Sequence, residues 1–80
     1  MDVYQRAVSR AVKIFMSDHR RSADSMARAL GITRGAFYAK SSNQRNWTLE
    51  NIAVLNDLGV RLPALSTGRK QGKGNSITPL

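Results

Sequence analysis

The side chains best suited to chemistry in this chain lie between Ser22 and Lys40, in the segment SADSMARALGITRGAFYAK. Its second half opens with the hydroxyl of Thr33 and the guanidinium of Arg34, which are hydrogen-bonding groups. The pattern predicts two short helices joined by a tight turn, with polar and basic residues at the start of the second helix. This arrangement is typical of a small domain that offers a helix to a DNA groove.

Catalysis and metal binding are not expected. The chain has no cysteine and one histidine, His19, which stands without a cluster of histidine or acidic ligands. A positioned nucleophile or acid–base pair is also missing. The GKG of the last fifteen residues lacks the strand and the helix that surround a phosphate-binding loop. We therefore expect no enzyme activity and no cofactor. The acidic residues are scattered over predicted caps, loops and helix surfaces: Asp2, Asp18, Asp24, Glu50 and Asp57.

Caps and apolar spacing define the two helices of the central segment. Ser22 is a suitable N-cap and Asp24 places a carboxylate at the positive end of the helix dipole, so a helix should begin at Ala23. Gly31 supplies the left-handed backbone that ends this helix, and Thr33 can cap the next one. The apolar side of the pair is formed by Ala23, Met26, the small Ala27, Leu30 and Ile32.

A longer helix, from about Asp2 to Met16, precedes this segment. Arg6, Arg10 and Lys13 fall nearly opposite its apolar residues, and we interpret them as a solvated face in preference to a phosphate-contacting stripe. The apolar face consists of Tyr4, Val8, Ala11, Val12 and Phe15.

A fourth helix is predicted after Thr48, which can cap it, and Gly59 should terminate it. Trp47, which precedes the cap, can pack against Ile52 as a hydrophobic staple. Its predicted buried face consists of Leu49, Ile52, Ala53, Leu55 and Leu58. Beyond it, Pro63 suits a short closing helical turn. The apolar residues Val60, Leu62 and Leu65 are interpreted as closing the core, with a dimer interface as the alternative.

The composition favours a nucleic-acid partner. The 80 residues carry 13 Lys and Arg against 5 Asp and Glu, for a net charge of +8 and a pI near 11.2. No apolar stretch is long enough for a membrane span or a signal peptide, so we expect a soluble protein of the bacterial cytoplasm, associated with the nucleoid. We expect an all-α domain of four or five helices over residues 1–65, and a flexible basic tail over 66–80.

The chain resembles the lambda-repressor-like helix-turn-helix domains of phage repressors and Cro-type proteins. The resemblance rests on the spacing of Ala27 and Gly31, on Ile32, on Phe37 at the core position of the second helix, and on the segment WTLENIAVLNDLGV. One residue departs from the family pattern, which usually has an apolar side chain where this chain has Lys40. Either the Lys40 stem covers the core or the helix ends differently here.

The resemblance implies that residues 33–40 enter the major groove of double-stranded operator DNA. Arg34 could bind O6 and N7 of one guanine, worth about 1 to 3 kcal/mol of discrimination, or it could contact a phosphate. The expected base-reading set is Thr33, Arg34, Gly35, Ala36 and the outward-facing Tyr38. The expected phosphate-binding set is Ser22, Lys40, Asn43, Gln44 and Arg45.

The resemblance implies that the protein regulates transcription as a small phage or prophage repressor or Cro-like protein. A homodimer is compatible with this function, and we expect no small-molecule ligand. One alternative is a protein-interaction module, such as an antitoxin or anti-repressor. Another is an architectural factor in recombination or excision.

Overall fold

The structure, a computed structural model, describes residues 3–63. These residues form four helices and no strand: α1 (Val3–His19), α2 (Ala23–Leu30), α3 (Arg34–Ser41) and α4 (Leu49–Leu58). The predicted all-α class is thereby confirmed for this part of the chain. Leu65 and the predicted tail over 66–80 lie outside the described residues.

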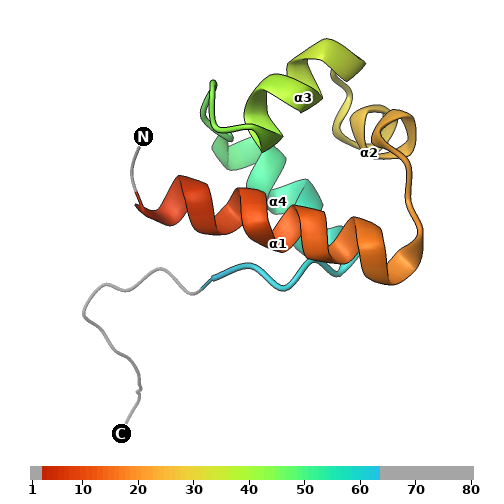
Figure 1. The fold of residues 1–80 in the computed structure, drawn as a ribbon, viewed down its shortest axis with the longest axis horizontal. Coiled ribbons are helices and arrows are strands. Elements are labelled where there is room, and N and C mark those ends of the chain that lie inside the picture. The colour runs from red at the N-terminus through yellow and green to blue at the C-terminus, as the bar shows by residue number, and fades with distance from the viewer. Residues whose placement is uncertain (1–2, 64–80) are drawn as a thin grey trace, which may run out of the picture.

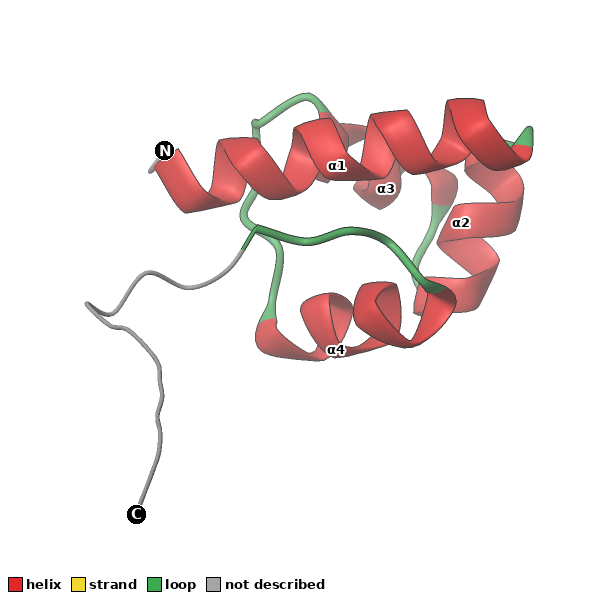
Figure 2. Ribbon diagram, turned by 90° about the horizontal axis from the view of Figure 1, so that it is seen from below, coloured by secondary structure: helices red, strands yellow, loops and turns green. Residues whose placement is uncertain are grey.

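The helices enclose one core. The long α1 runs along one side of the domain, with α3 packed against it and α2 beside α3 (Figure 1). Helix α4 lies on the side opposite α1, and the chain that follows α4 runs back between the two (Figure 2). Contacts join α2 to α3 and α4, and α1 to α3. The buried apolar side chains are Val8, Val12, Phe15, Met26, Ala27, Phe37, Trp47, Leu55 and Val60.

Helix α1 is longer than the sequence analysis predicted, because it ends at His19 and not at Met16. No residue between these two breaks a helix. The His19 ring packs on Phe15 four residues earlier, with 4.4 Å between the ring centroids. Arg20 then adopts a left-handed backbone with φ of 53°, which ends the helix without a glycine.

The predicted buried face of α4 was partly wrong. Leu49 is 84% exposed and Ala53 is also exposed, whereas Asn51 is buried. Asn51 completes a capping box with Thr48: its side chain accepts from the Thr48 N–H, and its own N–H donates to the Thr48 hydroxyl, both at 3.0 Å. This pairing fixes Asn51 on the inner side of the first turn, in line with Leu55 one turn later.

The predicted closing turn is not helical within residues 60–63. Gly59 ends α4 with φ of 99°, and the Val60 N–H donates to the Leu55 carbonyl at 3.0 Å. Val60 is buried and Leu62 packs against the core. These two residues therefore close the core, as the preferred sequence interpretation predicted.

A buried polar cluster joins α1 to the segment between α3 and α4; we call it the polar junction. The indole N–H of Trp47 donates to the Ser9 hydroxyl at 3.0 Å, and this hydroxyl lies 3.1 Å from the Lys40 carbonyl oxygen, to which it can donate. The side-chain amide of Gln5 pairs with both the N–H and the carbonyl of Trp47. The junction thus satisfies polar groups that would otherwise be buried without partners.

We predict that Ser9→Ala destabilises the domain. The substitution leaves the buried Trp47 indole N–H without its acceptor, which costs about 1 to 3 kcal/mol. For a domain of this size, each kcal/mol lowers the melting temperature by roughly 4 to 8 °C, which thermal unfolding followed by circular dichroism can measure. The control is Ser42→Ala, because the exposed Ser42 hydroxyl bonds only to the nearby Ala39 carbonyl. Equal melting temperatures for the two variants would contradict a structural role for the junction.

Candidate nucleic-acid interface

Helices α2 and α3 have the N-caps that the sequence predicted. The Ser22 hydroxyl accepts from the Ser25 N–H at 3.1 Å, and the Thr33 hydroxyl accepts from the Ala36 N–H at 3.0 Å. Between them, Gly31 adopts φ of 70° and donates its N–H to the Arg28 carbonyl. Because a side chain at this φ is strained, glycine suits the position. The turn therefore fixes where α3 begins.

Helix α3 has one anchored face and one free face. Phe37 is 1% exposed and packs edge-on to Trp47, with ring centroids 6.0 Å apart. Tyr38, the next residue, is 55% exposed, as predicted. Arg34 and Gly35 are also exposed, while Ala36 is half-buried. The free face thus carries a guanidinium, a phenol and a stretch with little side-chain bulk.

Arg34 has a partner that the sequence analysis did not assign. Its guanidinium lies 3.4 Å from the carboxylate of Asp24, and the side chains are 61% and 58% exposed, respectively. Between exposed groups such an ion pair contributes only about 0 to 1 kcal/mol, so a stronger anion can displace Asp24. The contact joins the first turn of α2 to the first turn of α3. No local signal predicts it, because the two residues belong to different helices.

The loop after α3 presents three of the predicted phosphate-binding residues. Asn43 takes a left-handed backbone with φ of 68°, and the N–H groups of Gln44 and Arg45 both donate to the Ala39 carbonyl. All three side chains are exposed. The structure therefore places polar and basic groups at both ends of α3: Thr33 and Arg34 at its start, and this loop at its end.

Lys40 is the exception among the predicted phosphate ligands. It is 7% exposed, and its ammonium donates to the Asn46 carbonyl at 2.9 Å. Burial and the nearby charge of Arg45 lower the pKa of Lys40 below 10.5. The Lys40 stem is buried, and its ammonium reaches a backbone carbonyl in place of solvent. In the free protein the ammonium is thus bonded to the backbone, and the phosphate contact of Lys40 stays a prediction.

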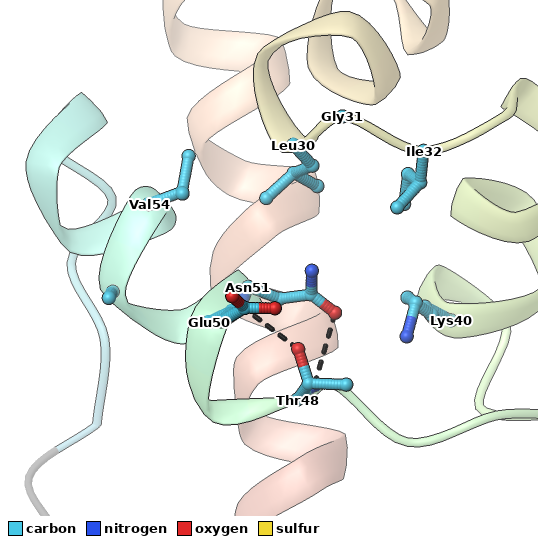
Figure 3. A pocket seen from close by; sticks show the side chains of 9 residues that line it. Leu30, Gly31, Ile32, Lys40, Thr48, Glu50, Asn51 and Val54 are labelled. Atoms are coloured by element: carbon cyan, nitrogen blue, oxygen red, sulfur yellow. Dashed lines mark hydrogen bonds between the residues drawn. The ribbon is translucent and has the colours of Figure 1, made fainter.

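An apolar groove of about 500 Å³ lies behind the turn, between α2 and the first half of α4 (Figure 3). Leu30 and Ile32 form one wall, and Ala53 and Val54 form the other. The polar side chains of Thr48 and Asn51 at its edge bond to each other's backbone N–H groups. Lys40 and Glu50 also line the groove, so two charged side chains stand beside its apolar walls.

Two other kinds of site are not found in the part of the chain that the structure describes. Residues 3–63 contain no group of three His, Asp or Glu side chains placed to hold a metal ion. Within the same range, no helix has both the length and the apolar character needed to cross a membrane.

We predict that the stability difference between the wild type and Lys40→Met depends on pH. The folded protein loses the Lys40 proton at a lower pH than the unfolded chain, so the unfolded chain binds more protons between the two pKa values. The free energy of unfolding of the wild type, relative to Lys40→Met, should therefore rise as the pH increases from neutral toward 10.5. Urea unfolding at a series of pH values measures this difference, and a constant value would contradict the effect of burial.

A second measurement on Lys40→Met separates the structural role from a phosphate contact. Because the ammonium is held by Asn46, the salt dependence of duplex binding should not change. If Lys40 did contact a phosphate, the slope of log K against log salt would become shallower by about 0.9.

We predict that Asp24→Asn strengthens binding to any duplex. The substitution frees Arg34 and removes a negative charge beside α3, and one charge interaction at contact distance in water is worth about 1 kcal/mol, or roughly fivefold in affinity. Asp57→Asn is the control, because Asp57 is an exposed carboxylate on α4 and its removal changes the net charge equally. Fluorescence anisotropy with a labelled duplex distinguishes the two variants. Equal gains for both would show that only net charge matters.

No protein-family model, no curated protein and no solved structure matches this chain.

Proposed function

We propose that this protein binds double-stranded DNA in a sequence-specific manner, with α3 in the major groove, and regulates transcription as a phage or prophage repressor or Cro-like protein. The observation that carries the proposal is the two-sided character of α3. Phe37 fixes the helix in the core, while Arg34, Gly35 and Tyr38 face outward. A helix fixed in this way can bring side chains to base edges in a defined register.

The surroundings of α3 support the same proposal. Ser22 lies at the start of α2, where backbone N–H groups favour a phosphate. Asn43, Gln44 and Arg45 lie beyond the other end of α3. Contacts of this kind position a protein on the duplex without reading sequence, so specificity rests on the α3 side chains. The net charge of +8 favours the encounter with DNA.

The proposal is tested by selecting bound duplexes from a random pool at near-physiological salt, where nonspecific Kd values are typically about 10⁻⁴ to 10⁻⁶ M. Enrichment of a motif would support a sequence reader. An inverted repeat with half-sites about 10 base pairs apart would indicate a homodimer, and a single half-site a monomer. Genomic copies of the motif beside promoters would support regulation, and copies beside an attachment site would support an excision factor.

A second candidate is a protein-interaction module that uses the helical scaffold to hold another protein. The apolar groove behind the turn and the 84% exposed Leu49 at the start of α4 favour it. Absence of any enriched motif in the selection would shift the proposal to this candidate.

We predict that Arg34→Ala and Arg45→Ala have different effects on DNA binding. Loss of Arg34 should reduce discrimination between the selected motif and random DNA, by about 1 to 3 kcal/mol if the base contact is bidentate. Loss of Arg45 should weaken binding to all sequences and make the salt slope shallower by about 0.9. Competition assays with specific and random duplexes measure both effects. Identical behaviour of the two variants would contradict this division of roles.

A further inference from the structure

Three basic side chains follow one line on the exposed surface of α1. Arg6, Arg10 and Lys13 are all exposed, and within residues 3–63 none of them forms an ion pair or a hydrogen bond with another described residue. At a rise of about 1.5 Å per residue, the stripe extends roughly 10 Å along the helix. We call these three residues the α1 stripe. Its charges have no acidic partner in the described part of the protein.

The stripe borders two shallow hollows. One has a volume of about 330 Å³ and is lined by Ser9, Asn43 and all three residues of the α1 stripe. The other, of about 340 Å³, is lined by Val3, Ala7, Arg6 and Arg10. No acidic side chain lines either hollow. A concave surface with three positive charges and one amide suits an anion with several oxygen atoms.

The first hollow lies beside the end of α3. Ser9, which lines it, lies 3.1 Å from the carbonyl oxygen of Lys40 near the end of α3. Asn43 follows α3 by two residues and is held there by a bond of 3.2 Å from its N–H to the same Lys40 carbonyl. The α1 stripe and Asn43 therefore line the same hollow, beside the end of α3.

We propose that the α1 stripe binds consecutive phosphates of one DNA strand, next to the groove that α3 enters. This inference rests on the proposed function. Along the DNA axis one strand carries a phosphate about every 3.4 Å, and because the strand winds around the axis its neighbouring phosphates lie further apart than this. The α1 stripe of roughly 10 Å therefore reaches about three of them only through its long side chains, which can splay apart. Asn43 lies between the phosphates bound by the α1 stripe and those proposed to bind at the end of α3. The α1 stripe thus acts as a second clamp on the backbone, in place of the solvated face that the sequence analysis favoured.

The test measures the salt dependence of binding to a labelled duplex of about two helical turns, taken from the selected pool. Removing one phosphate contact makes the slope of log K against log salt shallower by about 0.9, so Arg10→Gln should reduce it by about 0.9 and the triple variant Arg6→Gln/Arg10→Gln/Lys13→Gln by about 2.7. The matched control is Arg61→Gln, because Arg61 is exposed and lines a hollow with Ala11, Phe15 and Asp18 instead. It should leave the slope unchanged. Thermal unfolding checks that the variants remain folded.

The outcomes separate failure of this inference from failure of the proposed function. If the wild type has a steep slope and Arg34→Ala relaxes specificity, but the α1 variants behave like Arg61→Gln, the second clamp is overturned and DNA binding stands. If the wild type shows no enriched motif and a shallow slope, the proposed function itself fails. Phosphate ethylation interference gives an independent readout: the triple variant should no longer show interference at about three adjacent phosphates of one strand.

Discussion

The position of α3 depends on the polar junction between Ser9, Gln5 and Trp47. Helix α3 has eight residues, too few to be stable alone in water, so its geometry must come from what it packs against. Phe37 anchors the middle of the helix in the core. The Ser9 hydroxyl, between the Trp47 indole and the Lys40 carbonyl, ties the end of α3 to α1. The junction thereby sets both the loop after α3 and the start of α4.

Lys40 shows how a charged residue can occupy a core position. Its stem fills space next to the junction, and its ammonium reaches the Asn46 carbonyl at the surface end of the site. This bond adds to those that the Gln44 and Arg45 N–H groups make with the Ala39 carbonyl, and together they hold the loop of residues 42–47 against α3. An apolar residue would fill the same volume but would leave that carbonyl to water.

Local rules account for most of what the sequence predicted. The caps at Ser22, Thr33 and Thr48, and the left-handed Gly31 and Gly59, are confirmed because each depends on a few neighbouring residues. The predictions failed where a side-chain contact that apolar periodicity does not register decides the outcome. Asn51 is buried on the inner side of α4 through its bonds with Thr48, whereas Leu49 is exposed, and the Lys40 ammonium donates to a carbonyl six residues away. The nearness of Asn43 to the α1 stripe joins residues about thirty positions apart, which no periodicity reveals.

The junction also gives the molecule an optical reporter. Trp47 is the only tryptophan in the chain, and its indole N–H is bonded to Ser9 in a buried site. Indole emission responds to the polarity around the ring and to the partner of its N–H. Any movement of the end of α3 against α1 must alter this environment, since Ser9 contacts both. The intrinsic fluorescence of the unlabelled protein therefore reports on the packing of the end of α3 against α1. Global unfolding can be followed separately by the circular dichroism of the backbone.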